Sequence, residues 1–249
     1  MNDAAGRALL AATAVLQALS PLAAGLDQGS GQDPVVVPPG PFFAVWGFVV
    51  IGCLAVAVRG LAPARAASPL FRAVRAPLTA AQVGFALWLL AADRAPALTV
   101  PVFAGMLLAL AVALRRAVTV DPGTGRADAA LVRCTLGAYA GWSAAAVWVN
   151  TATQLQEPSR AVLAVLLAGA ALTVSAGALL FRGSAGFTAA GAWALLGALV
   201  STVAAGATGL AVLAGGGLVL AVVVAVLARR RRPSRPVPRP GPRLSPRRR

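Results

Sequence analysis

The chain alternates long apolar runs with short segments that are polar, charged or rich in proline. Eight apolar runs can be marked, at residues 7–26, 41–58, 76–92, 96–114, 131–151, 161–181, 186–204 and 209–228. A helical run of about twenty apolar residues crosses the hydrocarbon core of a bilayer. The pattern therefore predicts an all-α fold, a polytopic membrane helix bundle with about eight transmembrane helices.

The arginines test this division, because basic residues gather in the cytoplasmic loops of membrane proteins. All 22 basic residues are arginine, and the eight-helix division places 20 on the side of the C-terminus and two, Arg94 and Arg160, on the other. We therefore expect both termini to be cytoplasmic. Together with the arginine-rich and alanine-rich composition, this asymmetry predicts a multi-pass protein of the bacterial inner (cytoplasmic) membrane.

The two ends of the chain call for separate interpretation. Residues 1–25 have the short polar start, apolar stretch and small residues of a signal peptide, although the apolar stretch continues to Leu26, which favours a retained helix. Residues 229–249 hold ten arginines among repeated prolines and predict a disordered cytoplasmic tail that contacts anionic lipids. The net charge of +15 is mostly a property of this tail, so we expect no nucleic-acid partner.

The composition excludes several kinds of chemistry. The chain has no histidine, and Cys53 and Cys134 lie inside apolar runs, where we expect both to be small buried residues without a disulfide or a metal. No predicted span has an acidic residue near its middle, which disfavours an ion-coupled carrier. Phosphate-binding loops, nucleophile elbows and paired carboxylates are also missing from the sequence. We therefore expect neither an enzyme nor a cofactor.

One predicted helix carries a stripe of aromatic and amide residues. Tyr139, Trp142, Ala146 and Asn150 fall on one face at helical spacing, and Trp148 points to the opposite side. Such a face gives a pocket wall with a large apolar area and a few polar contacts, suited to a flat hydrophobic ligand. The alternative is that the aromatic residues only pack and Asn150 only joins helices.

The same predicted helix also carries a pair of glycines. Gly137 and Gly141 form a GxxxG pattern that allows close helix approach, either within the molecule or in a homodimer. The segment 27–40 begins polar and then holds Pro34, Pro38 and Pro39 ahead of the second predicted helix. As the longest predicted outside loop it is either a lid over a site or a simple connector.

These motifs resemble the TspO/MBR family of tryptophan-rich sensory or translocator proteins, which includes the peripheral benzodiazepine receptor. The spacing Y-x2-W-x3-A-x3-N matches at Tyr139, Trp142, Ala146 and Asn150, and P-x3-F-x2-V-W matches at Pro38, Phe42, Val45 and Trp46. Trp88 matches the tryptophan of the third helix, whereas Phe85 stands where the family has asparagine.

The resemblance implies a five-helix bundle over residues 1–157, followed by three additional transmembrane helices in 158–228 and the tail at 229–249. It implies a receptor or carrier for a porphyrin, a haem-related tetrapyrrole or a sterol-like molecule. The ligand-binding residues expected on this basis are Pro38, Phe42, Trp46, Trp88, Tyr139, Trp142, Ala146 and Asn150, under a lid formed by 27–40. An uncoupled permease of small metabolites and a structural membrane subunit are the alternatives.

Overall fold

The computed structural model describes residues 3–24, 33–120 and 125–231, and most of these residues are helical with no strand among them. Residues 27–32 of the predicted lid and the part of the predicted tail beyond residue 231 lie outside the described residues. The helical elements are α1 Asp3–Ala24, η1 Gly40–Ala44, α2 Val45–Leu61, α3 Pro63–Ala66, α4 Pro69–Arg94, η2 Pro96–Leu98, α5 Thr99–Thr119, α6 Arg126–Thr153, α7 Arg160–Leu180, α8 Ala185–Ala204 and α9 Thr208–Arg230.

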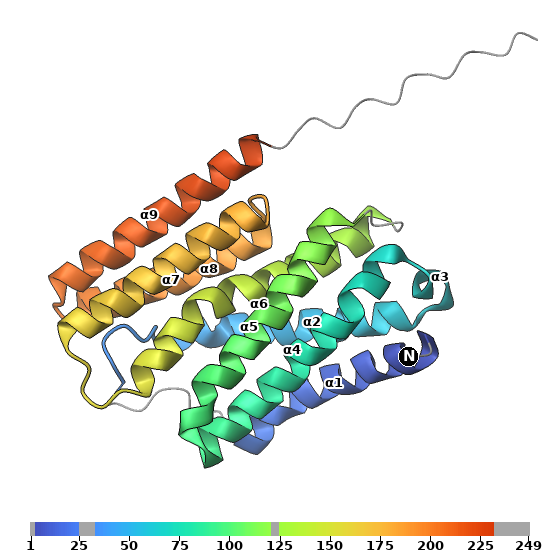
Figure 1. Cartoon of the computed structure of the whole chain (residues 1–249), viewed down its shortest axis with the longest axis horizontal. Helices are drawn as coiled ribbons and strands as arrows, with labels where there is room; N and C mark the ends of the chain where they lie inside the picture. Colours follow the sequence, from blue (N-terminus) through green and yellow to red (C-terminus); the bar gives the residue numbers. More distant parts are fainter. Residues whose placement is uncertain (1–2, 25–32, 121–124, 232–249) are drawn as a thin grey trace, which may run out of the picture.

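The long helices pack side by side as one bundle, with α1 at one edge and α9 at the opposite edge (Figure 1). Helix α6 occupies the middle and contacts α2, α5, α7 and α8, whereas α1 packs on α2 and α4, and α9 on α7 and α8. The protein is thus a polytopic helical membrane bundle, as the apolar pattern predicts. Each predicted apolar run coincides with one long helix.

The segment between α2 and the apolar part of α4 differs from the sequence prediction. Helix α4 begins at Pro69 rather than at residue 76, because a proline in the first helical turn starts a helix that continues through arginines before it becomes apolar. The connection before it contains the additional short helix α3. Hydropathy therefore identifies the apolar part of a helix that can lie in the membrane, but it does not identify the charged turns that continue the same helix.

Seven helices of the described residues are long and apolar enough to cross a membrane, and α6 is the long helix outside this group. Although α6 has 28 residues, its first turns carry charged side chains and its middle is enclosed by other helices. A helix surrounded by protein needs fewer lipid-facing apolar residues. The count of eight spans and the cytoplasmic placement of both termini remain predictions.

Helices α6 and α8 approach closely at the glycine pair. A Cβ atom added to Gly137 would lie 2.8 Å from the backbone nitrogen of Phe187, and one added to Gly141 would overlap the carbonyl of the same residue. Gly186 meets α6 equally closely at the backbone of Cys134. The GxxxG pattern therefore packs two helices of one chain, which leaves this face unavailable to a second copy.

A proline inside α4 leaves a carbonyl that another helix satisfies. Pro77 has no N–H to donate to Ala73, four residues earlier. The Nη1 atom of Arg116, at the end of α5, donates to that carbonyl oxygen over 3.1 Å. The contact lies at the exposed end of the two helices, where it satisfies the carbonyl of α4 and joins α4 to α5.

An ion pair joins three elements at the end of the bundle where α6 begins. The Nε of Arg59 donates to Asp128 over 2.8 Å, and the Nε of Arg65 donates to its other carboxylate oxygen over 2.5 Å. Asp128 is only 4% exposed and precedes the apolar stretch 131–151. The hydrogen bond from Arg65 is the main cause that lowers the pKa of Asp128 below its ordinary value of 3.8.

One prediction about the cysteines is wrong. Cys53 is buried as expected, but Cys134 is exposed on the surface of the bundle. In a membrane helix the apolar positions include those that face lipid as well as those that face other helices. An apolar neighbourhood in the sequence therefore does not imply burial.

The first prediction concerns the carboxylate of Asp128. Asp128→Asn should lower the melting temperature at pH 7, corresponding to a loss of about 1–2 kcal/mol of unfolding free energy. Because folding lowers this pKa, its contribution is full above 3.8 and is lost as the pH falls further. The difference between wild type and variant, measured by thermal unfolding in detergent, should shrink below about pH 4. Asp93→Asn, which breaks an exposed pair with Arg94, is the control and should change little.

The second prediction concerns the contact between α6 and α8. Gly141→Ala should lower the melting temperature strongly, because the added methyl group meets the backbone of Phe187. Gly105→Ala adds the same methyl group in α5 where nothing lies within 4 Å, and should leave stability unchanged or raise it. Equal melting temperatures for the two variants would contradict the close packing of these helices.

Candidate ligand-binding pocket

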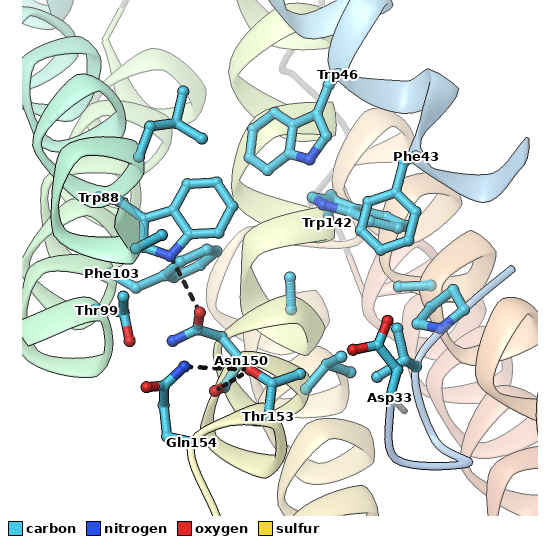
Figure 2. Close-up of a pocket in the computed structure, with 17 residues that line it drawn as sticks. Asp33, Phe43, Trp46, Trp88, Thr99, Phe103, Trp142, Asn150, Thr153 and Gln154 are labelled. Atoms are coloured by element: carbon cyan, nitrogen blue, oxygen red, sulfur yellow. Dashed lines mark hydrogen bonds between the residues drawn. The ribbon is translucent and has the colours of Figure 1, made fainter. Parts of the chain in front are cut away.

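A cavity of about 330 Å³ lies among α2, α4, α5, α6, α8 and the segment that precedes α2 (Figure 2). This volume is at the lower end of the range for small-molecule sites. The lining residues are Asp33, Val37, Pro38, Phe43, Trp46, Trp88, Leu89, Ala92, Thr99, Phe103, Trp142, Ala146, Val149, Asn150, Thr153, Gln154 and Ala194. The cavity is thus bounded by aromatic and aliphatic groups with a few polar groups.

Aromatic rings from four helices and from the 3-10 turn η1 form one wall of the cavity. Trp46, in the first turn of α2, lies 6.3 Å from Trp88 in a stacked arrangement and 6.4 Å from Trp142 edge to face, measured between ring centroids. Phe103 of α5 meets Trp88 edge to face at 5.3 Å, and Phe43 meets Trp142 at 5.5 Å. Contacts of this kind fix the rings and leave flat apolar faces toward the cavity.

The polar part of the cavity is centred on Asn150. Its side-chain oxygen accepts a hydrogen bond from the Nε1 of Trp88 over 3.0 Å, which joins α6 to α4. The Nδ2 of Asn150 is buried without a hydrogen-bond partner. Figure 2 shows Thr153 and Gln154 beside Asn150, with the side chain of Asp33 across the cavity. Asn150 therefore keeps donor capacity for a ligand.

Trp142 offers a second donor. It is 1% exposed, and its Nε1 has no hydrogen-bond partner. Burying an indole N–H without a partner costs free energy, and such groups are usually satisfied. A ligand with an acceptor group at this position would remove the cost.

The structure brings together six of the eight residues that the sequence and the resemblance suggested for the site. The six that line the cavity are Pro38, Trp46, Trp88, Trp142, Ala146 and Asn150. Tyr139 lies beneath the wall, where its hydroxyl donates to the carbonyl of Ala81 over 3.3 Å and its ring supports Trp46. Phe42 points away and contacts Trp193 at 4.4 Å. Trp148 points away from the cavity, as predicted, and donates to Thr173 of α7.

Sequence reasoning missed several lining residues. Phe43 takes the place expected for Phe42, because the 3-10 turn η1 decides which of the adjacent rings faces inward. Phe103 and Ala194 come from helices without a motif, and only their packing reveals them. Asp33 belongs to the described part of the predicted lid, which lines the cavity together with Val37 and Pro38.

The side chains around the cavity can contact a molecule through apolar surfaces and hydrogen bonds. The described lining side chains supply aromatic faces, amide and indole N–H donors, hydroxyl groups and one carboxylate. Across the described residues, no group of three or more His, Cys, Asp or Glu side chains is arranged to hold a metal ion.

Comparison with known proteins adds one finding. A family model described as TSPO-like protein matches residues 8–228, which includes the three C-terminal helices as well as the first five predicted spans. No curated protein and no solved structure matches the chain significantly.

The third prediction concerns the hydrogen bond between α4 and α6. Trp88→Phe keeps an aromatic ring but removes the donor to Asn150, and should lower the unfolding free energy by about 1 kcal/mol. Trp148→Phe removes a comparable indole hydrogen bond to Thr173, outside the cavity, and gives the matched control. Adding a ligand should separate the two variants, with a smaller thermal shift for Trp88→Phe. Equal shifts would place Trp88 outside the binding site.

Proposed function

Because the chain belongs to the TSPO-like family, we propose that it is an integral membrane receptor or carrier that binds a flat hydrophobic ligand in the cavity beside α6. The observation that carries this proposal is the pair of buried donors, on Trp142 and Asn150, that have no partner in a cavity with aromatic walls. The proposed role is binding rather than catalysis.

The cavity supports a particular ligand chemistry. The stacked and edge-to-face rings around Trp46 favour a flat aromatic or polycyclic molecule that buries its faces against them. The N–H groups of Trp142 and Asn150 favour an acceptor, such as a carbonyl or ring nitrogen, on the ligand. A porphyrin or haem-related tetrapyrrole has this combination, and a sterol-like molecule satisfies it less fully.

The membrane setting completes the proposal. The cavity lies among helices that are long and apolar enough to cross a bilayer. We propose the bacterial inner membrane as its location, with the arginine-rich C-terminal segment bound to anionic lipids on the cytoplasmic side.

The fourth prediction tests binding with protoporphyrin IX. Titrating the detergent-purified protein should quench tryptophan fluorescence saturably, after correction for absorption by the porphyrin. Asn150→Ala should weaken the affinity about tenfold, which corresponds to about 1.4 kcal/mol, because a donor is lost. Trp142→Phe should weaken it by a similar amount while keeping an aromatic ring.

The control is Trp148→Phe, because this side chain faces α7 outside the cavity and its loss should leave the affinity unchanged. Linear quenching that is the same in every variant would mean that the porphyrin only partitions into detergent, and the proposal would then be rejected. Substrate flux in proteoliposomes would instead support a permease, and co-purification that is indifferent to these variants would support a structural subunit.

A further inference from the structure

Helix α8 contacts the proline-rich segment before α2 along one of its faces. Trp193, Gly197 and Ser201 follow one another at intervals of four residues, which places them one above the next on the same side of the helix. Each of them meets a residue between Val37 and Phe42, more than 150 positions earlier in the chain. We infer that α8 is a positioning element that holds one wall of the cavity in place.

Two hydrogen bonds form this contact. The Oγ of Ser201 donates to the carbonyl of Val37 over 2.5 Å, and the Nε1 of Trp193 donates to the carbonyl of Phe42 over 3.0 Å. The intervening segment is rich in prolines, which supply no backbone N–H. Its carbonyls therefore need donors from elsewhere in an apolar surrounding, and α8 supplies them.

Packing adds to the hydrogen bonds. The rings of Trp193 and Phe42 lie 4.4 Å apart between centroids. At Gly197 a Cβ atom would lie 2.7 Å from the Cβ of Pro38 and 2.9 Å from the ring of Phe42, so the missing side chain makes the approach possible. The segment is held by ring contact, backbone hydrogen bonds and close packing together.

The same segment presents its other side to the cavity. Val37, Pro38 and Phe43 line the cavity, whereas Trp193, Gly197 and Ser201 do not. Only Ala194 of α8 reaches the cavity directly. The three anchoring residues therefore act on the site through the wall that they position, and binding depends on a helix beyond the first five predicted spans.

The expected effect of α8 on ligand affinity rests on the proposed function. The contact between α8 and the segment before α2 can be measured without a ligand. The test compares the full-length double variant Trp193→Phe/Ser201→Ala with wild type by hydrogen–deuterium exchange of the peptide covering residues 35–46. Loss of the two donors should speed exchange in this peptide about tenfold while the core of α6 stays protected. Trp148→Phe removes an indole hydrogen bond elsewhere on the bundle and should leave this peptide unchanged.

A second variant guards against a general loss of folding. Gly197→Ala places a methyl group against Pro38 and Phe42, whereas Gly216→Ala, on α9, has nothing within 4 Å and is the matched control. Gly197→Ala should speed exchange in 35–46, and Gly216→Ala should not. The affinity of the double variant for protoporphyrin IX should fall about tenfold, because the wall is no longer preorganised.

The outcomes separate the two proposals. Unchanged exchange in both the double variant and Gly197→Ala overturns the anchoring role, whether or not porphyrin binds. Faster exchange with an affinity equal to that of wild type overturns the positioning of the site. If wild type binds no porphyrin, the proposed function fails, and the exchange result alone decides whether α8 holds the segment.

Discussion

The close approach of α6 to α8 is the constraint on which the rest of the arrangement depends. Backbone meets backbone where Gly137 and Gly141 face Gly186 and Phe187, and no side chain larger than hydrogen fits there. This contact sets how far α8 stands from the middle of the bundle. Helix α8 in turn donates two hydrogen bonds to the segment before α2, which lines the cavity.

Lipid imposes a second constraint, since backbone and side-chain polar groups find no water inside the bundle. The structure satisfies several of them across helices. Trp88 donates to Asn150, and Trp148 donates to Thr173. Each of these hydrogen bonds also fixes the orientation of one helix against another. The N–H groups of Trp142 and Asn150 are buried without a partner at the cavity, as are polar atoms of Gln17 and Ser143 elsewhere in the bundle.

The site joins parts of the chain that hydropathy treats as separate. Its aromatic wall comes from α2, α4, α5 and α6, and its remaining wall is the proline-rich segment that α8 supports. Helices α7 and α8 are also joined near the glycine contact, where the ring centroids of Phe181 and Phe187 lie 5.0 Å apart. Helices α7 and α8 pack directly on α6, and the family match extends through all three C-terminal helices.

The sequence by itself determined the helical membrane class, the approximate position of each long helix, the stripe on α6 and the resemblance to the family. Hydropathy and the period of the helix suffice for these, because both are local properties of the chain. The tertiary structure alone decided that Phe43 and not Phe42 lines the cavity, that Tyr139 lies beneath it, that Cys134 is exposed and that α8 holds the wall. The helical period fixes the direction in which a side chain points from the axis of its helix. Which helix lies opposite that side chain depends on packing between residues far apart in the sequence.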